Sequence, residues 1–595
     1  MIRPYSCTPL IALALAIAMQ SASEAAVFRT RFDSGSAYLV VEVLDDDLVH
    51  FEAAQGSGPA ASQPIYTSPM VFKTDYAGPS SISQSGNLIE TPDLRLEVNP
   101  STLCVTAWDR KRNNTLLSTV CPVDLGQPLK GLNINPGQMQ TVYGLGQEFK
   151  DPNQRQPGLG PADGDWIQLG TRQGLKDRDG KEDLGNGFQG FLGGAVGNVQ
   201  IPVYYAVGPN NLNYALFMDN VYWQKWDFKR SPWQSRMYGD QLRFYLMTGP
   251  DLPDLRKDYL ELTGLPPVPP RKAFGLWVSE FGYDNWGQID QLLTGLRGSN
   301  FPVDGFVLDL NWFGGITPGD RSRSAMGRLD WDENQEPLVA DGRYFFPNPA
   351  AKIQQYRADH IGLSAIEESY IADSTNTYRE MPANLLAYTR DGSGKCNIGQ
   401  QSNPIEINAN DFWGIGRMID WTDPAAGTWI DQQRRFPNLV QMGINVHWTD
   451  LGEPERLDTQ ACYQGVETTP AGLKNEHRDI HNLYNLLWNQ SIWQGYGNRQ
   501  GQTDKLGRVN PRPLILTRSG AAGIQRYGAA MWSGDIPSNI SALATHFNAQ
   551  MHMAFSGIDY YGADIGGFRR ETMPYNNDQG AYRGYEEELY TQWFA

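Results

Sequence analysis

The chain has 595 residues, too many for a single compact core, and its length predicts about two to four domains. Hydrophobic residues make up 40% of the chain, which excludes a disordered protein. The 49 basic and 66 acidic residues give a net charge of −17, and this excess of negative charge argues against nucleic acid as a partner.

Residues 1–25 have the layout of a cleaved secretory signal peptide. A basic residue, Arg3, precedes an apolar segment from Leu10 to Met19, and small residues follow up to Ala25. The apolar segment is too short to span a bilayer, and no later stretch approaches the necessary length. We therefore expect cleavage near residue 25, a secreted or periplasmic product, and no association with a membrane after cleavage.

Removal of this leader takes away Cys7 and leaves Cys104, Cys121, Cys396 and Cys462. In an oxidising compartment these four residues allow three disulfide pairings. Proximity along the chain favours the pair Cys104 and Cys121. Four buried thiols are the alternative.

Short alternating segments dominate residues 26–265. Residues 37–43, 94–98 and 242–246 are examples in which apolar side chains alternate with polar ones. Alternation with a period of two, in β-branched and aromatic residues, predicts an N-terminal antiparallel β-sandwich. The proline-rich run 265–270 continues neither a helix nor a central strand, so it marks the end of this domain.

Residues 266–595 alternate apolar strands with helical stretches. Continuously apolar strands separated by helices indicate a parallel sheet, and their number favours a (β/α)8 TIM barrel over an open doubly wound sheet. Because the chain stops after the seventh strand, we expect a barrel that is incomplete at its C-terminus, with strand 8 missing. The seven expected strands lie within residues 274–281, 305–313, 362–371, 444–450, 514–519, 529–534 and 557–563.

Acidic residues follow several of these strands. Barrel enzymes carry their chemistry at the carboxyl ends of the strands, so we expect these side chains to meet. Glycoside hydrolysis requires such a pair of carboxylates, because one attacks the anomeric carbon or stabilises its charge while the other protonates the leaving oxygen. The acids in question are Asp309, Asp450, Asp535 and Asp564.

Four segments of this half, residues 304–313, 448–455, 518–535 and 562–568, resemble motifs of glycoside hydrolase family 31. The resemblance covers roughly residues 140–595 and begins with residues 142–148. It implies that Asp450 is the nucleophile and Asp535 the general acid and base. It also implies that Asp309, Asp564 and Arg518 bind the sugar.

Four aromatic residues in or beside these motifs are expected to wall the substrate pocket. They are Trp312, Trp448, Trp532 and Phe568. Core packing is the alternative for each of them. A structural ion pair is the alternative for the acids and for Arg518, and a helix cap is the alternative for Asp535.

The resemblance is greatest to the bacterial branch that holds α-glucosidases and 4-α-glucosyltransferases. It implies a retaining, exo-acting α-glucosidase that cleaves terminal α-linked glucose from an oligosaccharide without a cofactor. A glucosyltransferase or an α-xylosidase with the same site is the alternative. Two departures bear on the substrate. Ser369 stands where relatives usually have proline, and Ile540 stands where an aromatic residue often follows the general acid and base.

Two further hypotheses come from other classes of protein. A divalent-metal lyase or isomerase uses carboxylates on consecutive barrel strands, but no lysine follows Pro511 to serve as its base. An inactive carbohydrate-binding fragment is the other. His477 and His481 are spaced like metal ligands, but a third ligand is lacking nearby, and we predict packing or surface roles and no metal site.

Overall fold

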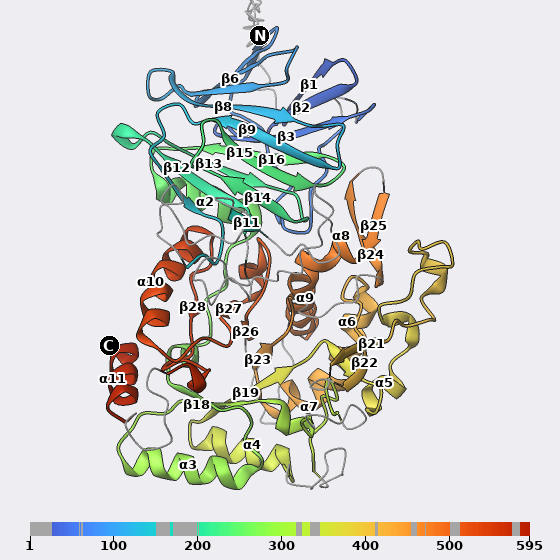
Figure 1. The fold of residues 1–595 in the computed structure, drawn as a ribbon, viewed down its shortest axis with the longest axis vertical. Coiled ribbons are helices and arrows are strands. Elements are labelled where there is room, and N and C mark those ends of the chain that lie inside the picture. Colours follow the sequence, from blue (N-terminus) through green and yellow to red (C-terminus); the bar gives the residue numbers. More distant parts are fainter. Residues whose placement is uncertain are drawn as a thin grey trace, which may run out of the picture.

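The protein is represented by a computed structural model. It describes residues 26–58, 60, 63–149, 167–169, 199, 201–316, 324–333, 345–410, 414–453, 461–469, 472–499, 512–573 and 583–595. The expected signal peptide, residues 1–25, lies outside these ranges. Within them, no helix combines the length and the apolar character needed to cross a membrane. Figure 1 shows an all-β part that contains the first strands, stacked on a part in which strands and helices mix.

Two antiparallel sheets form the N-terminal part, as the alternation predicted. The first has seven strands in the order β1-β2-β3-β16-β13-β12-β10, and the second has nine in the order β11-β14-β15-β9-β8-β7-β6-β5-β4. The first sheet contains β1 (Phe28–Ser34), β2 (Ala37–Val43), β3 (Leu48–Gln55), β10 (Thr141–Gly144), β12 (Val203–Val207), β13 (Asn213–Met218) and β16 (Leu242–Thr248). The second contains β4 (Ser83–Ser85), β5 (Leu88–Glu90), β6 (Leu94–Val98), β7 (Val105–Asp109), β8 (Thr115–Val123), β9 (Leu129–Asn135), β11 (Ile167–Leu169), β14 (Gln224–Asp227) and β15 (Trp233–Tyr238).

The two sheets share one apolar core. In β6 the side chains of Leu94, Leu96 and Val98 are buried while the intervening Arg95 and Glu97 are not, which is the pattern of a strand with one buried face. Residues from both sheets belong to the same cluster of buried apolar side chains. This packing of sheet on sheet confirms a β-sandwich.

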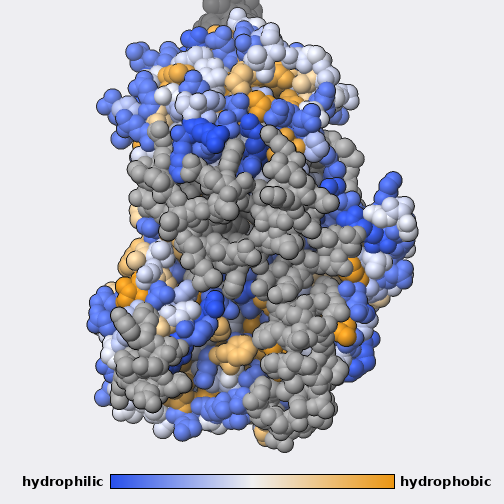
Figure 2. Space-filling view, in the orientation of Figure 1, coloured by the Kyte–Doolittle hydropathy of each residue, from blue (hydrophilic) through white to orange (hydrophobic). Residues whose placement is uncertain are grey.

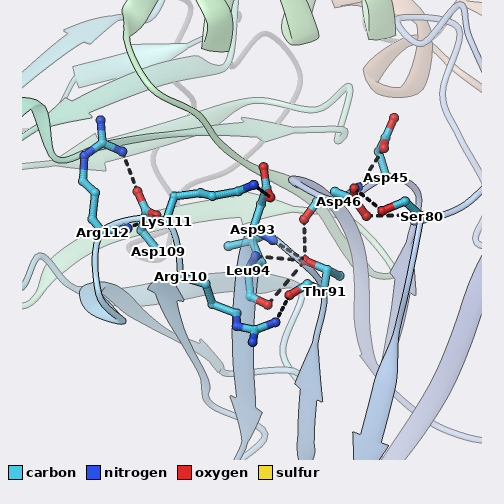
Figure 3. A network of polar contacts seen from close by, with 10 residues as sticks. All are labelled: Asp45, Asp46, Ser80, Thr91, Asp93, Leu94, Asp109, Arg110, Lys111 and Arg112. Carbon is cyan, nitrogen blue, oxygen red and sulfur yellow. Dashed lines mark hydrogen bonds and ion pairs between the residues drawn. The ribbon is translucent and has the colours of Figure 1, made fainter.

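A network of polar contacts joins the two sheets where their turns meet (Figure 3). Asp46, in the turn between β2 and β3, accepts hydrogen bonds from the backbone N–H of Ser80 at 2.8 Å and from its hydroxyl at 2.6 Å. The hydroxyl of Thr91, between β5 and β6, donates to the backbone carbonyl of Asp46. Arg110 in turn donates to the carbonyl of Thr91. The turns of one sheet are thereby fixed to those of the other.

The four cysteines among the described residues form two disulfides. Cys104 bonds to Cys121, as proximity along the chain predicted, and Cys396 bonds to Cys462. The alternative of four free thiols is therefore wrong for this structure. The second disulfide fixes the segment between β19 and β23 of the parallel sheet to the hairpin that follows β23.

All seven strands expected after residue 266 are present, and they form one parallel sheet. Its order is β17-β18-β19-β23-β26-β27-β28. The strands thus lie side by side in the order in which they occur along the chain. This sequential order is typical of a barrel and excludes a doubly wound sheet. The described residues contain no further strand of this sheet. Its members are β17 (Trp277–Ser279), β18 (Gly305–Leu308), β19 (Gly362–Glu367), β23 (Val446–Thr449), β26 (Leu514–Thr517), β27 (Ala529–Trp532) and β28 (Tyr561–Gly562).

Helices separate these strands and pack around them (Figure 1). Several begin at a side-chain cap: Asn285 accepts from the backbone N–H of Gln288, and Asn539 from that of Ala542. The helices are α2 (Leu252–Thr263), α3 (Trp286–Gly298), α4 (Pro349–Ala358), α5 (Asn376–Glu380), α6 (Pro424–Ile430), α7 (Phe436–Asn438), α8 (His477–Ile480), α9 (Tyr484–Gly497), α10 (Ile540–Phe555) and α11 (Arg583–Phe594). A three-stranded sheet contains β20 (Tyr370–Ala372), β21 (Ile407–Asn410) and β22 (Gly414–Met418). A two-stranded sheet contains β24 (Cys462–Thr469) and β25 (Gly472–Glu476).

One face of α10 carries apolar side chains on the surface. Phe547 and Met551 are 63% and 49% exposed. Figure 2 shows hydrophobic surface along the left edge of the molecule, at the level of α10 in Figure 1. The opposite face of the helix is buried through Ala542, His546, Ala549 and Met553, so this helix covers the sheet with one face only.

The segment 142–148, which resembles the family, links the sandwich to the parallel sheet. Tyr143 stacks on Phe555 at the end of α10, with ring centroids 4.9 Å apart. The backbone N–H of Gly146 donates to the hydroxyl of Ser556 at 2.8 Å, and Gln147 donates to the hydroxyl of Tyr561 in β28 at 2.9 Å. The sandwich therefore fixes the position of the last strand of the sheet.

Arg526 makes a second link between the two parts. Its guanidinium donates to the carbonyls of Met70 at 3.0 Å, Pro69 at 2.7 Å and Thr263 at 3.0 Å. Met70 and Pro69 lie in the sandwich part, and Thr263 ends α2. One side chain of the barrel thus satisfies three backbone carbonyls outside it.

Replacing Arg526 by Ala is expected to lower the free energy of unfolding by about 1–3 kcal/mol, because the carbonyls lose a charged donor. The measurement is thermal unfolding followed by circular dichroism. Arg569→Ala is the matched control, since among the described residues the side chain of Arg569 pairs with the exposed Glu571 at 2.9 Å, and its loss should change stability by less than about 0.5 kcal/mol. Equal melting temperatures for both variants would contradict this role of Arg526.

Candidate active site

The register of the parallel sheet aligns two successive rows of residues at the carboxyl ends of neighbouring strands, and the second row contains site residues. Glu367 of β19 pairs with Thr449 of β23, and Thr449 pairs with Thr517 of β26. Neighbouring strands in a sheet are about 4.8 Å apart, so the residues that follow these three lie side by side as well. This next row consists of Glu368, Asp450, Arg518 and Trp532, the last residue of β27.

The alternation of side chains along the strands gives the two rows opposite directions. Glu367 accepts a hydrogen bond from Arg435 at 2.8 Å, and Arg435 lies in the π-helical turn after α6, outside the sheet. Thr517 accepts from Asn485 of α9 on the same outer side. Successive residues of a strand point to opposite faces, so the row containing Asp450 points to the inner side of the curved sheet.

Arg518 holds two carboxylates at once. Its Nε lies 3.2 Å from Oδ1 of Asp450 and 2.5 Å from Oε1 of Glu453. The side chains of Arg518 and Glu453 are 3% exposed, whereas that of Asp450 is 18% exposed. The ion pair expected as the alternative for Arg518 is therefore present, and it fixes the more accessible Asp450 in position.

Asp309 follows β18 and lies among the same charges. Burial raises its pKa to about 8, although the backbone N–H of Leu310 donates to its Oδ1 at 2.6 Å and opposes the rise. The negative charges of Asp450, Asp535 and Asp564 add to the rise. This acid therefore tends to keep its proton near neutral pH.

Asp535 and Asp564 are brought together by the loops that follow β27 and β28. The carbonyl of Ile536 accepts hydrogen bonds from the backbone N–H groups of Phe568 at 3.0 Å and Arg569 at 2.9 Å. Burial, followed by the charges of Asp535 and Asp450, raises the pKa of Asp564 to about 7. The mutual influence of these charges shows that the four predicted acids form one cluster.

The four predicted aromatic residues lie in two different settings. Trp448 and Trp532 contact each other edge to face beside the acids, with ring centroids 5.7 Å apart. Phe568 is 43% exposed and lies 6.5 Å from Phe281, centroid to centroid, so it can offer a ring to a ligand. Trp312 is fully buried, and its indole N–H donates to a backbone carbonyl of β19 at 3.0 Å, as expected of a core residue.

Glu368 and Glu453 belong to the cluster but were not among the predicted site residues. Glu368 is 1% exposed, and burial together with the charges of Asp450 and Asp309 raises its pKa well above the usual value. Two acids, Glu367 and Glu368, follow residues 362–366, and the pattern that identified Asp309 points first to Glu367. The register that places Glu368 beside Asp450 cannot be read from one sequence.

His477 and His481 pack against each other. Nδ1 of His481 lies 2.9 Å from Nε2 of His477, and Tyr463 contacts the other ring nitrogen of His477 at 3.3 Å. Burial lowers the pKa of both histidines, to about 3 for His481. Both rings are therefore neutral near pH 7, and the prediction of a packing role is confirmed.

Among the described residues, the acids with the spacing of metal ligands lie outside the site. In the part of the chain that the structure describes, one set of three acids has carboxylate oxygens within 4.8 Å of one another, and it consists of Asp47, Asp254 and Asp258. These residues lie in the turn between β2 and β3 and in α2, away from the parallel sheet.

Comparison with known proteins identifies a family whose model matches the second part of the chain. The model of the glycosyl hydrolases family 31 TIM-barrel domain matches residues 266–595. Alpha-glucosidase 2 of Bacillus thermoamyloliquefaciens is 24% identical over 375 residues, which are 62% of this chain and 42% of that protein. Neutral alpha-glucosidase AB of Sus scrofa is 28% identical over 344 residues, 56% of this chain and 31% of that protein. The chain spans less than half the length of these two relatives.

Solved structures of similar fold extend over nearly the whole chain. A family 31 dextranase from Flavobacterium johnsoniae, complexed with isomaltotriose, has a TM-score of 0.70 at 18% identity and covers 96% of this chain and 63% of its own. A family 31 alpha-xylosidase from a soil metagenome, complexed with xylose, has a TM-score of 0.68 at 19% identity and covers 96% and 74%. At this identity the likeness concerns the fold, both the β-sandwich and the parallel sheet.

The raised pKa of Asp309 predicts that stability falls with rising pH. Between about pH 4, the ordinary pKa of an aspartate, and the folded value of about 8, the folded chain keeps a proton that the unfolded chain has lost. The free energy of unfolding therefore decreases across this window. Asp309→Asn removes this titration, and the variant should exceed the wild type in stability by more than about 1 kcal/mol near pH 8.5.

Thermal unfolding of both proteins from about pH 5 to 8.5 tests this expectation. The advantage of Asp309→Asn should shrink toward pH 5, because Asp309 is then protonated in the folded wild type. Asp373→Asn, at an exposed position, is the control and should follow the wild type throughout. Parallel curves for wild type and Asp309→Asn would show that Asp309 is not buried among charges as described.

Proposed function

The chain belongs to glycoside hydrolase family 31, and on that premise we propose that it is a retaining, exo-acting α-glucosidase. Its substrate would be a terminal α-linked glucose of an oligosaccharide. The observation that carries the proposal is the cluster of Asp309, Asp450, Asp535 and Asp564 around Arg518 at the carboxyl ends of the strands. The names of the relatives, α-glucosidases for the most part, support glucose as the sugar.

In the proposed reaction, a carboxylate oxygen of Asp450 attacks the anomeric carbon of the glucosyl residue. The bond from this carbon to the leaving oxygen breaks, and Asp535 donates its proton to that oxygen. The product of this step is a glucosyl ester of Asp450. Asp535, now ionised, takes a proton from water, whose oxygen displaces Asp450 and releases glucose in the original α configuration.

The surroundings of the two residues suit these roles. The nucleophile must be ionised, and Arg518 lies 3.2 Å from Asp450 to stabilise its negative charge. The acid must hold a proton at the working pH, and the charges of neighbouring acids favour protonated carboxyl groups in this cluster. The positive charge that develops on the sugar ring would be met by Asp450 and by whichever neighbouring acids are ionised.

Asp309 and Asp564 would bind hydroxyl groups of the sugar, since a carboxyl group can pair with two neighbouring hydroxyls. Phe568, 43% exposed, would contact an apolar face of the ring. Transfer to a second sugar uses the same intermediate, with a sugar hydroxyl in place of water. An α-xylosidase remains the second candidate, because an alpha-xylosidase of Saccharolobus solfataricus is 23% identical over 60% of this chain.

A panel of maltose, isomaltose, nigerose and isoprimeverose tests the proposed function. Hydrolysis of at least one glucoside should exceed that of isoprimeverose, and NMR should detect the α anomer before mutarotation. Activity should persist in a chelator, which separates this proposal from a metal-dependent lyase. Release of the β anomer would exclude retention, and no hydrolysis of any glycoside would leave a binding fragment as the better account.

Replacing Asp535 by Ala separates acid catalysis from nucleophilic attack. Disaccharides, whose leaving groups need a proton, should lose on the order of 10²–10⁴-fold in kcat/KM. A dinitrophenyl α-glucoside, which leaves without protonation, should lose far less in the same step. Asp450→Ala is the matched comparison and should lose activity on both substrates. Equal losses on both substrates for Asp535→Ala would count against its acid role.

A further inference from the structure

Glu367 is the last residue of β19 and Glu368 follows it, and the structure gives these two glutamates opposite surroundings. Glu367 points to the outer side of the sheet, where Arg435 donates to it at 2.8 Å and His447 contacts it at 2.6 Å. Glu368 points to the inner side, in register with Asp450. Both side chains are 1% exposed, so they differ in their neighbours and not in their burial.

The charged groups around Glu368 come from three neighbouring strands, and most are negative. They are Asp309 after β18, Asp450 and Glu453 after β23, and Arg518 after β26. The one positive group, Arg518, already lies 3.2 Å from Asp450 and 2.5 Å from Glu453. Among the described residues, Glu368 therefore lies beside several acids, and the guanidinium of Arg518 is shared between two of them.

We propose that Glu368 is a positioning residue for the nucleophile: a neutral carboxylic acid on the side of Asp450 opposite Arg518, whose O–H group donates to the carboxylate of Asp450. The proposal rests on the proposed function, in which Asp450 attacks the sugar. No proton is transferred in this role. Glu368 keeps its proton while Asp450 changes from carboxylate to ester and back.

Hydrogen-bonding capacity supports this assignment. Among the described residues, Oε2 of Glu368 has no hydrogen-bond partner, and Oδ1 of Asp450 accepts no hydrogen bond of good geometry although Arg518 is close to it. A buried polar atom without a partner costs free energy. A proton on Glu368 turns one of these two acceptors into a donor and satisfies both groups.

The pKa values of the two glutamates differ in the direction that this assignment requires. Burial, Asp450 and Asp309 raise the pKa of Glu368 well above its usual value, and the opposing effect of Arg518 is smaller. For Glu367, the Arg435 guanidinium and His447 overcome the effect of burial and lower the pKa. At the end of β19, Glu367 is thus an ionised carboxylate on the outer side of the sheet. Glu368 is a neutral carboxyl group on the side of Asp450.

Such a donor would matter for the rate because attack needs one orientation of the nucleophile. With Arg518 on one side and Glu368 on the other, Asp450 is fixed from both neighbouring strands. A misplacement of about 1 Å in a reacting group costs on the order of 10²-fold in rate. An ionised Glu368 would instead repel Asp450 and displace it.

Two substitutions in the 595-residue chain separate the effect of the donor from that of side-chain size. Glu368→Gln keeps the shape and supplies a neutral N–H donor, and kcat should stay within about threefold of the wild type. Glu368→Met keeps the length without any donor, and kcat should fall on the order of 10²-fold while KM changes by less than about threefold. Equal kcat for the two variants would overturn the positioning role. If Glu368→Met does not fold, a loss of kcat in Glu368→Gln comparable to 10²-fold overturns it instead.

Infrared spectroscopy tests the proton independently of activity. Near neutral pH, where the pKa of Glu368 is raised well above its usual value, the spectrum of the wild type minus that of Glu368→Gln should contain a carbonyl band of a protonated carboxyl group. Glu368→Gln should lose this band, and an unchanged spectrum overturns the proposal. A protein that shows the band but hydrolyses no glycoside would contradict the proposed function while confirming the neutral state of Glu368.

Discussion

Several acidic side chains share one guanidinium at the carboxyl ends of the parallel strands, and this crowding is the constraint on which the site depends. Arg518 lies within 3.2 Å of both Asp450 and Glu453, so one cation fixes two acids. The pKa values of Asp309, Asp564 and Glu368 are raised, because burial and negative neighbours act on each of them. Several carboxyl groups in a site of this kind keep their protons near neutral pH. The site favours a ligand that becomes positively charged. The oxocarbenium-like transition state of glycoside cleavage has that property.

The sheet separates two kinds of acid by the direction of alternate side chains. The outer row carries Glu367, which accepts a hydrogen bond from Arg435 and contacts His447. The inner row carries Glu368 and Asp450 with fewer cations, and it faces the place where a sugar would bind. The outer pairs stabilise the strand ends, whereas the inner cluster is costly to ionise. The sandwich contributes by holding the last strand through Gln147 and Tyr561, which keeps Asp564 near the other acids.

Local patterns in the sequence predicted the β-sandwich, all seven parallel strands and the disulfide between Cys104 and Cys121. They also predicted which acids would gather, because each follows an apolar strand. Strand register decided what they could not predict. Glu368 becomes a neighbour of Asp450 only through the pairing of Glu367 with Thr449, and Trp312 is a core residue because its indole bonds to β19. Contacts of this kind join residues far apart in the chain, and a single sequence contains no record of them.

The central claim is that Asp450 is the nucleophile of this cluster. The most direct measurement is mass spectrometry of the protein after reaction with a fluorinated glucosyl fluoride that slows release of the covalent intermediate. The account predicts one sugar per chain, attached to the peptide that contains Asp450, and no label in Asp450→Ala. A label on Asp309, Asp535, Asp564 or any other residue would contradict it.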